Sequence, residues 1–390
     1  KFVPGLKVLV FHGAARKELV DQIPEHDIVL TTYPLIARDH ELILGRDWHM
    51  AILDEAQTIK NPNAATTRWL GAIKASHRFC LTGTPMENHL GELWSIMSFA
   101  NPGYLGDKTA FTRNWRTPIE KEGNTMRAAA LTRRVKPFLL RRTKEEVASE
   151  LPAKIDIVET VEIDGKQRDL YDSIRAAMAT KVRKALEERG LARSHIVVLE
   201  ALLRLRQVCC DPRLVKLDKV ERPSAKLDRL MEMVEELLSE GRKIIIFSQF
   251  TSMLALIEER FEAADIGYEL LTGDTRDRKR AIEAFQNGDS PVFLISLKAG
   301  GVGLNLTAAD TVIIYDPWWN PAVEAQAIDR AHRIGQDKKV FVYRLVTAGT
   351  IEEKIGELKL RKQALADSLF DREGNVGKAL TEDDIAALLS

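Results

Sequence analysis

The stretch "HMAILDEAQTIKNP" at residues 49–62 joins an apolar run to two adjacent acids. The run from Met50 to Leu53 ends at Asp54 and Glu55. Short apolar runs of this kind are typical of strands buried on both faces of a parallel sheet. Ligands of such sheets bind beyond the carboxyl ends of the strands. We therefore expect Asp54 and Glu55 to face a ligand crevice; a solvated strand end is the alternative.

The same pattern recurs along the chain and predicts an α/β fold. Short runs rich in β-branched or bulky apolar residues are each followed by a helix-like segment, which is typical of βα units around parallel sheets. Two groups of runs predict two lobes. The runs span residues 7–13, 27–33, 50–55 and 78–84 in the first group, and 243–250, 268–274, 291–297, 311–316 and 340–346 in the second.

The sequence between the two groups is mainly helical. Leu170, Ile174, Met178 and Val182 recur at steps of four and predict one apolar helix stripe, which Gly190 would end. We expect four regions: 1–86, the C-terminal part of the first lobe; 87–225, a helical insertion and connection; 226–349, the second lobe; and 350–390, a closing helix and acidic tail.

Composition limits the possible functions. The 390 residues carry 57 Lys plus Arg and 57 Asp plus Glu, so any nucleic-acid binding must depend on local clusters. The three cysteines lack CxxC spacing, which argues against a disulfide framework or a zinc site and favours a reducing compartment. No apolar run approaches the roughly 18 residues of a membrane helix. We expect a soluble intracellular protein.

Two further segments carry residues suited to phosphate chemistry. "LTGTPMEN" (81–88) places Thr82, Gly83 and Thr84 after the next strand, where they could sense an acid–phosphate arrangement or simply form a turn. "SLKAGGVGLNLTAAD" (296–310) is rich in glycine, which lets backbone amides approach a phosphate closely. Its glycines are Gly300, Gly301 and Gly303.

The stretch "QAIDRAHRIGQ" (326–336) is the more specific signal. Gln326, Arg330 and Arg333 stand at i, i+4 and i+7, so on a helix they would form one polar stripe. Paired guanidinium groups suit arginine fingers, which stabilise charge on a transferred phosphoryl group. An exposed basic helix is the alternative.

Six motifs in this order resemble the Swi/Snf-type DNA-dependent ATPases of helicase superfamily two. They are "DEAQ", "LTGTPMEN", "IIIFSQF", "LTGDT", "SLKAGGVGLNL" and "QAIDRAHRIGQ". The resemblance covers nearly the whole chain and implies two RecA-like lobes with ATP and Mg²⁺ at the cleft between them. It also implies tracking along double-stranded DNA and, in many members, remodelling of protein–DNA complexes.

The resemblance assigns roles to individual residues. Asp54 and Glu55 match the acids that hold magnesium and activate water, and Gln57 matches a coupling residue. Arg330 and Arg333 match the arginine fingers, and Gln326 the glutamine of the same motif. The residues expected to couple ATP to motion are Gln57, Thr82, Gly83, Thr84, Gly301 and Gly303.

Candidate DNA contacts lie in both lobes. Thr31 and Thr32 follow a strand and match a family motif that contacts the DNA backbone. Arg141 and Arg142 belong to the acid-free cluster "RRVKPFLLRRTK" (133–144), which could neutralise phosphates or serve closure of the cleft. Lys298 is a weaker candidate. The expected partners are double-stranded DNA and a DNA-bound protein complex, with a monomeric chain and no membrane.

A GxxxxGK[ST] phosphate loop is absent from the 390 residues. Since such a loop precedes the "DEAQ" strand in this family, we expect a fragment of a larger ATPase that hydrolyses ATP poorly alone. The compact insertion suggests a bacterial or archaeal protein associated with the nucleoid; a eukaryotic one would be nuclear. The alternatives are a strand-separating DNA or RNA helicase and a non-catalytic DNA-binding scaffold.

Overall fold

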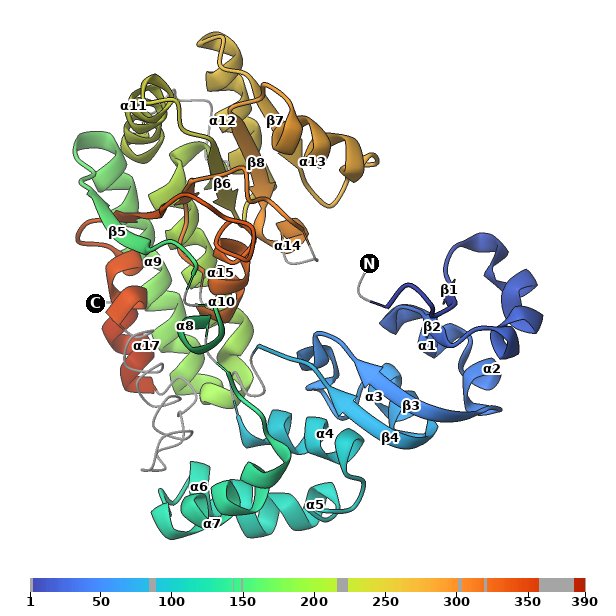
Figure 1. Ribbon diagram of the computed structural model, residues 1–390. Coiled ribbons are helices and arrows are strands. Elements are labelled where there is room, and N and C mark those ends of the chain that lie inside the picture. Colours follow the sequence, from blue (N-terminus) through green and yellow to red (C-terminus); the bar gives the residue numbers. More distant parts are fainter. Residues whose placement is uncertain are drawn as a thin grey trace. The chain divides into compact units, whose positions relative to one another are not determined.

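The chain forms two compact units (Figure 1). The computed structural model describes residues 3–83, 89–142, 144–148, 150–215, 224–300, 304–318, 321–357 and 382–389. The described residues up to Leu139 form the first unit, and those from Leu140 onward form the second. All nine strands expected from the sequence are present.

The first unit contains two pairs of parallel strands. β1 (Val8–Val10) pairs with β2 (Ile28–Leu30), and β3 (Asp47–Leu53) pairs with β4 (Lys74–Cys80). Leu53 lies opposite Cys80, so the residues that follow β3 and β4 emerge at the same edge. The helices of this unit are η1 (Ala14–Glu25), α1 (Tyr33–Arg38), α2 (His40–Leu44), η2 (Ala56–Ile59), α3 (Ala65–Gly71), α4 (Leu90–Ala100), α5 (Lys108–Phe111), η3 (Thr112–Arg116), α6 (Thr117–Glu120), α7 (Thr125–Val135) and η4 (Lys136–Phe138).

Only one face of these strand pairs is well buried. Leu53 packs in a core with residues of η2, α3 and α4. The neighbouring Ile52 points to the other face and is 57% exposed. The same alternation leaves further apolar side chains exposed on this face, namely Val8, Val10, Ile28, Leu30, Met50 and Phe79.

The second unit is built on a six-stranded parallel sheet in the order β5-β10-β9-β6-β8-β7. Along the central strand β6, Ile244 and Ile246 pack into one core and Ile245 and Phe247 into another. Both faces are therefore covered, as parallel sheets require. The strands are β5 (Lys154–Val161), β6 (Ile244–Ser248), β7 (Tyr268–Leu271), β8 (Val292–Ser296), β9 (Thr311–Ile314) and β10 (Val340–Thr347).

Helices α9 (Gly165–Arg189) and α10 (Leu191–Cys210) form a hairpin. The stripe from Leu170 to Val182 packs into its core, and Gly190 ends α9 with φ +67°, so both predictions are confirmed. Cys209 and Cys210 are fully buried in helix α10. The other helices are α8 (Lys144–Val147), η5 (Pro212–Val215), α11 (Ala225–Ser239), α12 (Thr251–Ala263), α13 (Arg278–Asn287), α14 (Leu297–Gly300), α15 (Pro321–Ile328) and α17 (Glu382–Leu389).

Strand β5 was not predicted. It lies inside the expected helical insertion of residues 87–225 and pairs with β10 along all eight of its residues. The boundary between the compact units, at Leu139 and Leu140, also falls inside this insertion. The lobe boundaries at 86, 225 and 349 stay predictions, because compactness alone does not define a lobe.

The C-terminal helix is described in part. Residues 351–357 are helical, as expected for the start of the closing helix, and residues 358–381 lie outside the described residues. Among the helices that the structure describes, none has the length and apolar character needed to cross a membrane.

Candidate functional site

The acid pair lies where β3 ends. Asp54 is exposed and Glu55 is half-buried, with the left-handed backbone angle φ +49°. Such a conformation costs a non-glycine residue about 1–3 kcal/mol and is concentrated at functional sites. Two hydrogen bonds hold the turn: Glu55 N donates to Asp54 Oδ1 at 3.0 Å, and Thr58 Oγ1 donates to Glu55 O at 2.9 Å.

A chain of hydrogen bonds joins Glu55 to the segment that follows β4. Gln57 Nε2 donates to Glu55 Oε2 at 2.6 Å, and Thr82 Oγ1 donates to Gln57 Oε1 at 2.7 Å. Backbone bonds from Ala56 N to Leu81 O and from Leu81 N to Leu53 O fix the two segments together. The structure therefore brings Glu55, Gln57 and Thr82 into one relay, with Gly83 exposed beside it.

Tyr33 ties the end of β2 to the end of β3. Its hydroxyl donates to Asp54 O at 2.6 Å, and burial raises the pKa of Tyr33 well above its ordinary value, so the phenol stays a donor. Thr31 and Thr32, between β2 and α1, are both exposed. The two threonines thus lie in the segment that Tyr33 anchors to the acid pair.

The arginine segment begins on α15 but does not continue as a helix. Gln326 lies within α15, which ends at Ile328, so Arg330 and Arg333 stand in the turns that follow. The predicted single helix stripe is therefore wrong. The segment instead bonds to the loop 304–309: Leu306 N donates to Arg330 O at 3.0 Å, and Arg333 Nη1 donates to Leu304 O at 3.1 Å.

Gln336 fixes the same loop and was not assigned from the sequence. Its Nε2 donates to the carbonyls of Thr307, Ala309 and Ala331 at 2.8–3.1 Å. Gln336 is 6% exposed, and a buried amide requires such partners. The only signal in the sequence was its place at the end of the motif "QAIDRAHRIGQ".

A second set of contacts holds the arginine segment from helix α8. Lys144 Nζ donates to the carboxylate of Asp329 and to His332 O, the latter at 2.8 Å. The His332 ring contacts Pro152 O through Nε2 at 2.8 Å, which ties this ring to the segment before β5. Lys144 and Asp329 were not predicted, since they are 185 residues apart.

A buried charged network lies at the carboxyl ends of β6 and β9. Asp316 is fully buried and accepts a hydrogen bond from Ser248 Oγ at 2.5 Å. Arg206, from α10, donates to Gln249 Oε1 at 3.0 Å and to Pro317 O at 2.6 Å. Burial raises the pKa of Asp316 to about 6, although the nearby Arg206 opposes the shift.

Trp318 packs within this network. Its ring lies 5.9 Å from the guanidinium carbon of Arg206, and its backbone N donates to the carboxylate of Glu324 in α15. These two contacts pack Trp318 against α10 and α15, and its neighbour Trp319 lies outside the described residues.

The remaining predicted residues are distributed over both units. Lys298 is exposed on α14, and Arg141 and Arg142 are exposed at the start of the second unit. A Cβ atom at Gly300 would lie 2.8 Å from the ring of Phe247, so close packing requires glycine there. Thr84, Gly301 and Gly303 lie outside the described residues.

The described residues contain no group of three or more His, Cys, Asp or Glu side chains arranged for a metal ion. Magnesium needs no such group, because it is commonly held by one or two carboxylates together with water and phosphate oxygens. The exposed carboxylate of Asp54, beside that of Glu55, fits this ligand preference.

Two family models match the chain. The SNF2-related domain matches residues 1–214, and the helicase conserved C-terminal domain matches residues 225–335. The chain belongs to the SNF2 family. This result, together with the parallel sheets, confirms the expected α/β fold class with two RecA-like lobes.

Relatives are identical to this SNF2-family chain at about a third of the aligned positions. It is 38% identical, over 98% of its length, to YwqA of Bacillus subtilis, whose name describes an ATP-dependent helicase/translocase. It is 32% identical over its full length to the ISWI chromatin-remodeling complex ATPase ISW2 of Saccharomyces cerevisiae. The chain spans 42% and 36% of these two proteins.

A solved structure agrees with this assignment. The SWI2/SNF2 ATPase core domain of Sulfolobus solfataricus is 35% identical, with a TM-score of 0.51. The match covers 99% of this chain and 79% of the Sulfolobus chain.

Proposed function

We propose that this SNF2-family chain forms the motor core of an ATP-dependent double-stranded DNA translocase that remodels protein–DNA complexes. The relay from Glu55 through Gln57 to Thr82 is the observation that carries the proposal. It joins an acid at the end of one strand to a hydroxyl after the next strand, through hydrogen bonds of 2.6 and 2.7 Å.

In the proposed reaction, Asp54 and Glu55 act at the end of β3. Asp54, which is exposed, would hold the Mg²⁺ of the nucleotide, and the ion would supply positive charge to offset the charge on the transferred phosphoryl group. Glu55 orients the attacking water. Because Gln57 bonds both Glu55 and Thr82, a change at the carboxylate reaches the segment after β4.

Arg330 and Arg333 supply the positive charge that stabilises the transition state, with Gln326 beside them on α15. A guanidinium contributes to catalysis only when it is held in place. Gln336 and the loop 304–309 bond to the arginine segment, and Lys144 and the His332–Pro152 contact hold it as well.

Duplex DNA is the proposed track. Thr31 and Thr32 in the first unit and Arg141, Arg142 and Lys298 in the second are exposed and polar or cationic, as phosphate contacts require. The relative ISW2 is named as a chromatin-remodeling complex ATPase, which supports remodelling as the purpose of translocation.

The test is ATP turnover with and without duplex DNA. We expect low turnover from residues 1–390, which contain no GxxxxGK[ST] loop, and DNA-stimulated turnover from a chain that carries such a loop ahead of residue 1. Arg330→Ala in the longer chain should lower turnover by about 10³-fold or more, the scale of an arginine finger.

Three outcomes separate the alternatives. DNA-stimulated turnover by residues 1–390 alone would contradict the need for the phosphate loop. Duplex binding without turnover by the longer chain would favour the scaffold. Strand separation in an unwinding assay would favour the helicase over the translocase.

A further inference from the structure

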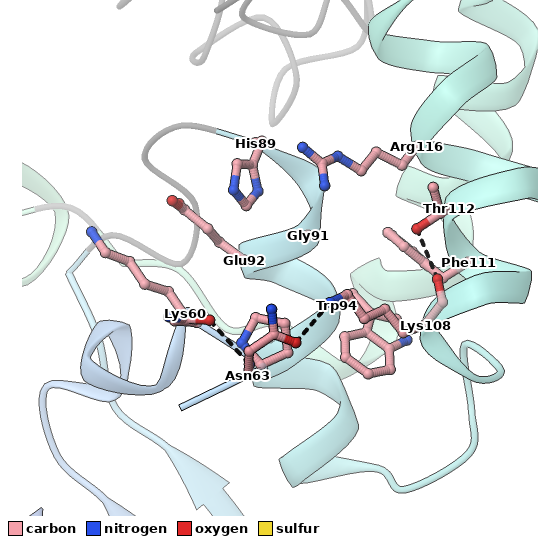
Figure 2. Close-up of a pocket in the computed structure, with 12 residues that line it drawn as sticks. Lys60, Asn63, His89, Gly91, Glu92, Trp94, Lys108, Phe111, Thr112 and Arg116 are labelled. Carbon is pink, nitrogen blue, oxygen red and sulfur yellow. Dashed lines mark hydrogen bonds between the residues drawn. The ribbon is translucent and has the colours of Figure 1, made fainter. Parts of the chain in front are cut away.

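A cavity of about 300 Å³ lies in the first unit, apart from the acid pair (Figure 2). Four segments line it: the loop that follows η2, the start of α4, helix α5 and helix η3. Pro62, Trp94 and Phe111 provide apolar wall, and the polar lining includes Asn61, Asn63 and Thr112.

The charges that line the cavity are mainly positive. Lys60, Lys108 and Arg116 contribute three cations, while Glu92 and the Glu120 carboxylate bonded to Arg116 contribute two negative charges, which leaves an excess of one positive charge. Lys108 Nζ donates to Asn63 Oδ1 at 2.9 Å, but this neutral amide does not balance its charge. Arg116 Nε donates to Glu120 Oε2 at 2.8 Å, and the other carboxylate oxygen of Glu120 accepts a hydrogen bond from Leu90 N.

His89 and Arg116 approach the same point in the cavity (Figure 2). A Cβ atom at Gly91 would lie 3.1 Å from His89 Nδ1 and 3.4 Å from Arg116 Nη1, so glycine leaves room between the two side chains. His89 Nδ1 is shielded from solvent and has no hydrogen-bond partner among the described residues. A buried polar atom of this kind costs stability unless a ligand or water satisfies it.

We propose that this cavity binds a phosphate group. A singly charged phosphate balances the excess of one charge, and its tetrahedral oxygens can accept hydrogen bonds from Lys60, Lys108 and the His89–Arg116 corner, which come from different elements. A planar carboxylate offers acceptors over a narrower range of directions. The apolar walls lower the local dielectric and strengthen each of these contacts.

The proposed phosphate site is distinct from the ATPase residues. None of the lining residues belongs to the Glu55–Gln57–Thr82 relay, and the proposal does not rest on ATP hydrolysis. The phosphate could be free in solution or part of a DNA backbone. Both sources present the same chemistry, so the experiment has to distinguish them.

Isothermal titration of residues 1–390 with inorganic phosphate tests the site directly. We expect saturable binding that weakens about tenfold or more in Lys60→Gln and in Lys108→Gln, since each loses a charged hydrogen bond. Lys74→Gln removes an exposed lysine at the start of β4 and should bind phosphate unchanged. Absent binding, or equal weakening in all three variants, would overturn the proposal.

Gly91→Ala tests the geometry without changing the charge. The added methyl group crowds His89 and Arg116, so phosphate binding should weaken while the thermal unfolding temperature stays close to that of the parent chain. Unchanged binding in Gly91→Ala would remove the His89–Arg116 corner from the site.

Competition with a duplex identifies the source of the phosphate. Phosphate displaced by a short duplex, in the parent chain and in Lys74→Gln, would assign the site to a DNA backbone phosphate. Phosphate that stays bound in the presence of duplex would assign it to a free phosphate.

Discussion

The hydroxyl of Thr82 joins the relay to the segment after β4. Thr82→Val keeps the shape of the side chain and removes the hydrogen bond to Gln57 Oε1. The free energy of unfolding should fall by about 1 kcal/mol, the net value of one such bond. In a chain competent for ATP hydrolysis, ATP turnover should fall while the affinity for the nucleotide stays unchanged.

Thr67→Val is the matched control for Thr82→Val. Thr67 Oγ1 donates to Ile59 O at 3.5 Å and takes no part in the relay. Denaturant unfolding and steady-state turnover measure the two effects. Equal turnover in Thr67→Val and Thr82→Val would show that the relay does not couple the two segments.

Asp316 should make stability depend on pH. Its pKa is about 6 in the folded chain and near 3.8 when unfolded, so the folded state binds its proton more tightly. The stability from this group is fully present below pH 3.8 and is lost as the pH rises through about 6. A shift of this size corresponds to about 3 kcal/mol.

Asp316→Asn removes this titration and keeps the size of the side chain. The unfolding free energy of the parent chain, measured relative to Asp316→Asn, should therefore decrease between about pH 4 and pH 7. Urea unfolding at several pH values measures the difference. Parallel profiles for the two chains would contradict a raised pKa at Asp316.

Residues that are close in sequence were easier to predict than those joined across the fold. Asp54, Glu55 and Gln57 stand in one short motif after a recognisable strand. Lys144 and Asp329 meet only because the chain returns after 185 residues, and Arg206 reaches Pro317 over 111. No local pattern reports such partners, so these contacts required the structure.

At the scale of elements, hydrophobic runs located the strands and tertiary bonds decided where helices end. Nine runs became strands because each carries enough apolar residues for a buried sheet. Strand β5 was not predicted, because polar residues alternate with its apolar residues and no continuous apolar run marks the strand. Helix α15 stops at Ile328, where the following turns bond to the loop 304–309 instead.

Neighbouring residues of β3 should respond very differently to substitution. Ile52 is 57% exposed, whereas Leu53 is 7% exposed and packs with Ala56 and Ile59. Ile52→Thr keeps β-branching and should change the unfolding free energy by less than about 0.5 kcal/mol, while Leu53→Ala should cost about 2–5 kcal/mol.

The exposed face of β3 allows a second measurement on the variants Ile52→Thr and Leu53→Ala. Ile52→Thr should lower the binding of a dye that reports exposed apolar surface, because Ile52 contributes to that face. Leu53→Ala should not lower dye binding. If Ile52→Thr proved as destabilising as Leu53→Ala, both faces of β3 would have to be covered in solution.

At the scale of the whole molecule, charge balance limits how the proposed duplex DNA would bind. The 57 basic and 57 acidic residues cancel, so affinity for a duplex has to come from clusters and not from the overall field. Each phosphate contact releases counterions, and the logarithm of the binding constant falls with the logarithm of salt concentration by about 0.9 per contact.

The double substitution Arg141→Ala/Arg142→Ala should make this salt dependence shallower. Both arginines are exposed, so each can contact one phosphate, and losing both contacts should reduce the slope by about 1.8. Lys279→Ala/Arg280→Ala on α13 removes the same charge from two other exposed residues and serves as the control. Duplex titrations at several salt concentrations give both slopes. An equal change in the two variants would mean that overall charge, and not the cluster at residues 133–144, holds the DNA.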